Sequence, residues 1–144
     1  QRLSDAILQT KSEVPVKFIL MNTTGNINKH AGETVSKGQS IVVALIRHLL
    51  PPHADNEEAA RYLQSNFGDN QKRVEWVAVR PDSLIDKESV SEYQVYASPI
   101  RSAIFDAGKT SRINVARFMS QMILNEEEWS KWKRQMPVVY NDCL

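Results

Sequence analysis

The stretch "RVEWVAVRPDSL", residues 73–84, decides how the fold is interpreted. Residues 74–79 form a nearly unbroken apolar run, which suits a strand covered on both faces, with Glu75 near the entry end as the exception. Arg80 and Pro81 are expected to end the strand, because proline fixes φ and has no backbone donor. The pattern predicts a buried strand whose abrupt end opens a crevice.

A second run of strand length, "VKFILM" at residues 16–21, is closed by the polar, glycine-containing segment "NTTGN". The residues between the two runs favour helices, so the connection is too long for a hairpin. Residues 34–50 are the first expected helix, in which "IVVALI" at 41–46 is apolar all round and is therefore expected to be buried. Pro51 and Pro52 are expected to terminate it.

The second expected helix is amphipathic, with Asp55 or Asn56 as its N-cap and Gly68 as its stop. The remaining expected elements are a helix already under way at residues 1–10, a short extended segment at 91–98, a helix from 111 to 124 capped by Ser111, a short helix within 125–135 that carries Trp129 and Trp132, and a final strand at 137–140. The two tryptophans are interpreted as packing anchors.

The alternation of helices and strands predicts an α/β fold with a doubly wound, parallel sheet. Only two or three strands are expected, and they would leave sheet edges and helix faces uncovered. We therefore expect residues 1–144 to be a single domain that packs against a missing half or another protein chain.

Composition narrows the possible functions. The chain has 144 residues, of which 42% are hydrophobic, enough for one domain with a core. The net charge is +1 and the signs are interspersed, so no nucleic-acid or membrane partner is expected. Cys143 is the single cysteine and cannot form an internal disulfide, which predicts a cytoplasmic protein. The three histidines have no metal-ligand spacing, so no metal is expected.

Three motifs, "FILMNTTGN", "VEWVAVRPDSL" and "TSRINVARFM", stand in an order and spacing that resembles atypical short-chain dehydrogenase/reductases, the NmrA-like and epimerase-like NAD(P)-binding proteins. The resemblance spans almost the whole chain and matches their C-terminal, substrate-side half. It implies the C-terminal part of a Rossmann-type fold that binds NAD or NADP and a small-molecule substrate.

The resemblance also implies a cofactor site at the two strand ends. Asn22, Thr23, Thr24 and Gly25 match the family's Ser-Ser-x-Gly turn, in which a hydroxyl lies near the nicotinamide or the substrate, and Thr23 would keep that hydroxyl. Arg80 and Pro81 match an Arg-Pro turn that lies against the nicotinamide. The alternatives are turn residues that satisfy backbone groups and an ion-paired arginine at a strand end.

On the same resemblance, Asp82, Ser83 and Leu84 would face the substrate or a covering loop. Ser111, Arg112 and Asn114 match the family's S-R-x-(D/N)-V-A helix start, where this chain has Asn114 in place of the usual aspartate. We interpret these three residues as structural.

The chain departs from the family in its catalytic residues. It contains no Tyr-x-x-x-Lys pair, in which lysine and cofactor lower the tyrosine pKa, and no glycine-rich G-x-x-G-x-x-G phosphate loop. Thr23, His53 and Tyr62 are the remaining catalytic candidates, and a surface or capping role competes for the last two. Three interpretations stay open: an oxidoreductase or epimerase-like enzyme, a non-catalytic NmrA-like dinucleotide-binding redox sensor or regulatory interaction module, and an inert interaction domain.

Overall fold

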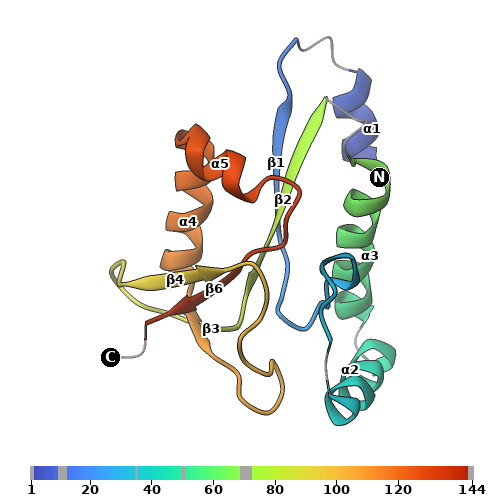
Figure 1. Cartoon of the computed structure of the whole chain (residues 1–144), viewed down its shortest axis with the longest axis vertical. Helices are drawn as coiled ribbons and strands as arrows, with labels where there is room; N and C mark the ends of the chain where they lie inside the picture. Colours follow the sequence, from blue (N-terminus) through green and yellow to red (C-terminus); the bar gives the residue numbers. More distant parts are fainter. Residues whose placement is uncertain (1, 10–12, 35, 50, 69–72, 143–144) are drawn as a thin grey trace.

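A four-stranded sheet forms the centre of the molecule (Figure 1). The structure is a computed structural model that describes residues 2–9, 13–34, 36–49, 51–68 and 73–142, so Cys143 lies outside the described residues. Along the sheet the strands are β1 (Val16–Met21), β2 (Val74–Pro81), β6 (Val138–Asn141) and β4 (Tyr93–Tyr96). The first three are parallel, and β4 runs antiparallel to β6. The mixed α/β class with a mostly parallel sheet is confirmed.

The pairing of β1 with β2 confirms that the two apolar runs are parallel neighbours. Their register runs from Val16 opposite Val74 to Met21 opposite Val79. Every residue of β2 is buried except Glu75, which is half-buried, as expected for a strand covered on both faces.

β2 ends at Pro81, as the sequence predicted, and Arg80 and Pro81 are its last two residues. Arg80 and Pro81 pair with Val138 and Val139, the first two residues of β6. β6 therefore lies beside only the carboxyl end of β2. Proline is tolerated here, and its carbonyl accepts a hydrogen bond from the Thr24 amide at 3.2 Å.

The two faces of β2 pack into two separate cores, because successive side chains of a strand point to opposite faces. Val77 and Val79 pack with α4 (Arg112–Leu124) and α5 (Glu126–Trp132). Trp76 and Ala78 pack on the other face with α3 (Pro51–Asn66), and α1 (Arg2–Gln9) lies on the same side (Figure 1). Both tryptophans of α5 are buried in the first core, which confirms their role as packing anchors.

The helix α3 begins earlier than the sequence predicted. It starts at Pro51, directly after α2 (Lys37–Leu49), rather than at an N-cap of Asp55 or Asn56. Prolines fit the first turn of a helix, because the amides there have no intrahelical acceptor. The helix ends at Asn66, two residues before Gly68.

The expectation that the apolar residues 41–46 of α2 are buried was wrong for Ile41 and Leu45 and is confirmed for Val43, while the burial of Ile46 lies outside the described residues. Val43 is 7% exposed, whereas Ile41 and Leu45 are 70% and 58% exposed. In Figure 1, α2 projects past the end of α3 and away from the sheet, so only one side of it meets the rest of the domain. None of the described helices is long and apolar enough to cross a membrane.

Short elements connect the layers. The 3-10 helix η1 (Lys29–Ala31) lies in the segment after β1, and a two-stranded parallel ribbon pairs β3 (Ser83–Ile85) with β5 (Lys109–Ser111). Ser111 ends β5 and caps α4, where its hydroxyl accepts a hydrogen bond from the Asn114 amide at 3.3 Å. This cap was predicted from the sequence, whereas β3 and β5 were not.

Candidate functional site

The segments that follow β1 and β2 lie side by side at the carboxyl edge of the sheet. The Asn22 amide donates to the Val79 carbonyl at 2.7 Å, and the Thr24 amide donates to the Pro81 carbonyl at 3.2 Å. The parallel pairing therefore brings the two motifs singled out in the sequence to one edge.

Asn22 and Thr23 shape the turn after β1. The Asn22 side-chain amide donates to the Asn56 carbonyl at 3.0 Å, and its oxygen accepts from the Thr23 amide at 2.8 Å. The Thr23 hydroxyl accepts from the Gly25 amide at 3.3 Å, and the Thr23 side chain is half-buried. Both residues satisfy backbone groups in the manner of turn residues, while Thr23 keeps its hydroxyl proton for another acceptor.

Asp82 joins three segments through one buried carboxylate. One oxygen accepts from the Thr24 hydroxyl at 3.1 Å and from the Ser83 amide at 3.0 Å, and the other accepts from the Gly108 amide at 2.8 Å. Burial raises the pKa of Asp82 above its ordinary value, and these three hydrogen bonds, with the charge of Arg101, oppose the shift only in part. The carboxylate thus ties the turn after β1 to the loop that ends in β5.

Ser83 and Leu84, the other two residues predicted on the substrate side, lie beyond Asp82 in β3. Ser83 is exposed, and Leu84 is half-buried and packs against the core that contains Val77.

Arg80 is fully buried and forms a bidentate ion pair with Glu33. Its two terminal nitrogens donate to the two carboxylate oxygens of Glu33 at 2.7 and 2.8 Å. The other donors reach the carbonyls of Met136, Asn26 and Ala97, so each of the five guanidinium N–H groups has an acceptor.

The ion pair changes the titration of Glu33. Burial by itself would raise the pKa of Glu33, but the hydrogen bonds and charge of Arg80, together with the Asn28 amide, hold it below its ordinary value. Sequence reasoning missed Glu33, because one glutamate in an irregular loop has no periodicity or spacing that marks it as the partner of Arg80.

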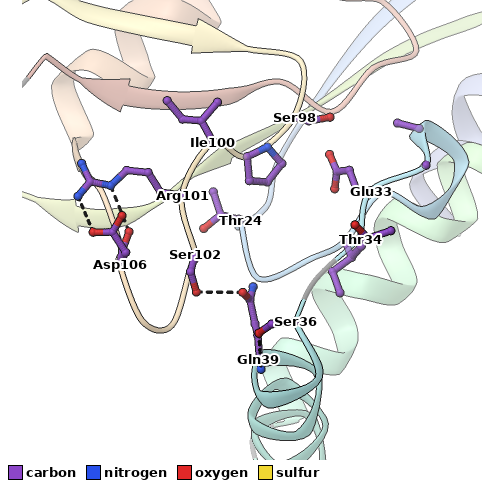
Figure 2. Close-up of a pocket in the computed structure, with 14 residues that line it drawn as sticks. Thr24, Glu33, Thr34, Ser36, Gln39, Ser98, Ile100, Arg101, Ser102 and Asp106 are labelled. Carbon is purple, nitrogen blue, oxygen red and sulfur yellow. Dashed lines mark hydrogen bonds and ion pairs between the residues drawn. The ribbon is translucent and has the colours of Figure 1, made fainter.

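A cavity of about 600 Å³ adjoins these strand ends (Figure 2). One wall is the segment after β1 with the start of α2, and the other is the loop of residues 98–106. The Ser102 hydroxyl donates to the Gln39 side-chain oxygen at 2.9 Å and links the two walls, while Arg101 is ion-paired with Asp106 at 2.7 Å. The polar side chains on the walls belong to Thr24, Glu33, Thr34, Ser36, Gln39, Ser98, Arg101, Ser102 and Asp106.

Of the predicted site residues, Thr24 is the one that lines this cavity. Asn22, Arg80 and Asp82 are buried behind its walls, where they hold the lining segments together.

The candidates on α3 lie elsewhere. Tyr62 is half-buried, packs edge-on against Phe67 with ring centroids 5.9 Å apart, and lines none of the described pockets. His53 lies in the first turn of α3, and its side chain is outside the described part of the structure. Within the described residues, no three His, Cys, Asp or Glu side chains gather where they could hold a metal ion.

Asn114 is fully buried in a polar cluster at the start of α4. Its side-chain amide donates to the Asn141 oxygen at 2.8 Å and to the Ser91 hydroxyl at 3.1 Å, and its own oxygen accepts from the Ser91 amide at 3.0 Å. The cluster ties α4 to β6, which agrees with the structural role predicted for Asn114 and Ser111.

Comparison with known proteins supports the fold. No family profile and no curated protein matches the sequence. An NAD-dependent epimerase/dehydratase from Bacillus halodurans matches 86% of this chain and 45% of its own, with 17% identity and a TM-score of 0.55. A wide-type short-chain dehydrogenase/reductase from Veillonella parvula, solved with NADP, matches 86% of this chain and 50% of its own, with 14% identity and a TM-score of 0.48.

The chain spans about half the length of these two solved structures. Together with the parallel order β1, β2 and β6 and the helices on both faces, the likeness to the first establishes a Rossmann-like α/β fold.

Proposed function

We propose that this chain is the C-terminal, substrate-side half of an NAD(P)-binding oxidoreductase or epimerase-like protein of the atypical short-chain dehydrogenase/reductase class. The observation that carries the proposal is the junction of the two strand-end segments beside the cavity of about 600 Å³. In open parallel sheets, ligands bind beyond the carboxyl ends of the strands, where loops leave backbone and polar groups available. The fold neighbour described as NAD-dependent supports the choice of a dinucleotide.

Within this proposal the strand-end residues divide into two roles. Thr23 and the turn around it contact the nicotinamide end of the dinucleotide, because the Thr23 hydroxyl retains a donor. Arg80 has an acceptor for each of its donors, so it positions the loop that carries Glu33 rather than contacting the ligand. The cavity beyond Thr24 takes the substrate.

The alternative is a non-catalytic NmrA-like dinucleotide-binding redox sensor or regulatory module. It is favoured by a specific observation: none of the four tyrosines has a lysine four residues later, and Tyr62 packs against Phe67 outside the cavity. In this case dinucleotide binding persists without turnover, and its output is the binding of another protein.

The test requires a protein that carries this chain together with a glycine-rich phosphate loop. Calorimetric titration with NADH and NADPH measures binding, and a hydride-transfer assay over a panel of carbonyl substrates measures turnover. Thr23→Val removes the proposed hydrogen bond to the dinucleotide, together with the bond that the hydroxyl accepts from the Gly25 amide, and is expected to weaken dinucleotide affinity by about threefold to tenfold. Ser120→Ala, an exposed hydroxyl on α4, is the matched control and leaves the affinity unchanged.

The outcomes separate the two functions. Saturable binding with turnover supports the enzyme, and saturable binding without turnover supports the sensor. Failure to bind either dinucleotide contradicts both.

A further inference from the structure

A second pocket, of about 630 Å³, lies between η1 and the helices α2 and α3. It shares Ile27, Glu33 and Thr34 with the cavity described above, so the segment that follows β1 forms a wall of both. The other lining residues of the second pocket are Asn26, Lys29, His30, Ser40, Val43, Ala44, Glu57, Arg61 and Gln64. This pocket has no part in the proposed dinucleotide function.

Two cationic side chains face the lining of this pocket. Lys29 and Arg61 line it with full charges, and His30 adds a ring nitrogen donor. The pairing of Arg61 with Glu58 is an exposed ion pair, which holds a guanidinium only weakly.

Two acids also line the pocket, but one of them is already neutralised. Both oxygens of Glu33 are bound by Arg80, with distances of 2.7 and 2.8 Å. Glu57 is the other acid, and it opposes only part of the charge of Lys29 and Arg61.

A buried donor without an acceptor points to a ligand more directly. The side-chain nitrogen of Asn26, a lining residue that is 7% exposed, has no hydrogen-bond partner among the described residues. The neighbouring amide of Gln64 donates to the Asn28 side-chain oxygen at 2.9 Å, so that oxygen is already in use. Leaving a buried donor unpaired is costly, so a small shift of the Asn26 amide toward the pocket would be favoured once an oxyanion there supplies an acceptor.

The rest of the lining is apolar. Ile27 is half-buried and Val43 is buried, and both lie in the same pocket as the cations. From the cations, the unpaired Asn26 donor and this apolar surface, we propose that the pocket binds a small organic anion, in which a phosphate or carboxylate group is attached to an apolar body.

Phenyl phosphate is the probe, because it combines both features, and phenol and inorganic phosphate each carry one of them. Binding to the chain is measured by calorimetry and by NMR shifts of the Asn26 side-chain amide. We expect saturable binding of phenyl phosphate that weakens with added salt. Phenol and inorganic phosphate should each bind at least about tenfold more weakly.

Two variants locate the site. The double variant Lys29→Gln with Arg61→Gln is expected to weaken phenyl phosphate binding by at least about tenfold. Lys87→Gln removes an exposed lysine outside the pocket and should leave binding unchanged. Asn26→Asp replaces the unpaired donor with a negative charge and should abolish binding, with thermal unfolding recorded to confirm that this variant is folded.

Three results would overturn the proposal: no saturable binding of phenyl phosphate, equal binding by wild type and the double variant, or phenol binding as tightly as phenyl phosphate. A response that is equal for all oxyanions and is lost in both Lys87→Gln and the double variant would show nonspecific charge attraction and would also overturn it.

Discussion

Arg80 belongs to a motif that suggests a ligand site, yet its side chain has a structural role in the protein interior. It follows an apolar run, at a position where a charged side chain is expected to reach solvent or ligand, yet it is fully buried and holds Glu33 in a bidentate pair. A buried charge is tolerated only when its partners are complete, so Glu33 and the three carbonyls around Arg80 act as a unit.

Loss of the Glu33 charge should therefore be strongly destabilising. Glu33→Gln leaves Arg80 buried without a counter-charge, and the expected loss is about 3–5 kcal/mol in the free energy of unfolding, measured by urea titration. Glu58→Gln is the matched control, because it breaks the exposed pair with Arg61 and should cost less than about 1 kcal/mol. Equal losses for the two variants would contradict the buried role of Glu33.

The raised pKa of Asp82 gives a pH dependence of known sign. Because folding favours the protonated carboxyl, its stabilising contribution is complete below the unfolded pKa and declines as the pH rises through the folded pKa. Thr24→Val removes a hydrogen bond to the ionised form and should raise the pKa of Asp82 further, as measured by NMR titration. Thr34→Val, in the same cavity but without a contact to Asp82, should leave it unchanged; a lower pKa in Thr24→Val would contradict the assignment.

At the scale of elements, the hydrophobic periodicity of the sequence predicted the strands and the helix cap, which local residues determine. It did not predict which helix faces are buried, because burial depends on packing between elements. The runs in β1 and β2 are apolar enough to specify a covered parallel pair, and Ser111 followed by an apolar stripe specifies the cap of α4. The residues of α2 are apolar as well, yet Ile41 and Leu45 are exposed, because burial depends on a partner that the helix sequence does not contain.

The candidate site was predictable to a similar extent. The parallel order of two strands fixes which loops meet, so the meeting of the turn after β1 with the end of β2 followed from the sequence. The opposite wall comes from the loop of residues 98–106, which has no motif, and β3 and β5 are too short for a period to be recognised. Glu33 was missed for the same reason, since only the folded chain brings it to Arg80.

The junction between the loop of residues 98–106 and β5 depends on a glycine. A methyl group added at Gly108 would lie 2.5 and 2.8 Å from two ring carbons of Tyr140, closer than atoms can approach. Gly108→Ala should therefore lower the free energy of unfolding by about 1–3 kcal/mol and displace the loop from Asp82. At Gly68 no atom lies within 4 Å of an added methyl group, so Gly68→Ala is the control and should change the free energy of unfolding by no more than about 0.5 kcal/mol. Thermal unfolding measures both variants. A Gly108→Ala variant as stable as the control would show that the Tyr140 ring moves aside freely.

At the scale of the whole molecule, one end of the sheet and one helix lack cover. In the described part of the chain β1 pairs only with β2, which leaves its other edge without a strand partner. Met21 at the end of β1 is 50% exposed, and Ile41 and Leu45 lie four residues apart on one side of α2. Exposed edges and contiguous apolar side chains are features by which chains associate.

We therefore expect the 144-residue chain to associate, either with itself or with a chain that supplies the remaining strands. Sedimentation velocity over a range of concentrations should show a species heavier than the monomer, and an apolar dye should bind the part of the chain that stays monomeric. The double variant Ile41→Glu with Leu45→Glu places two charges on the exposed side of α2 and should shift the equilibrium toward monomer, while Leu124→Glu, on an exposed position of α4, should not. Because both variants change exposed residues, neither should alter the free energy of unfolding by more than about 0.5 kcal/mol, so a shift in association can be separated from a loss of folding. A chain that sediments as a monomer at all concentrations and binds no dye would show that β1 and α2 need no partner.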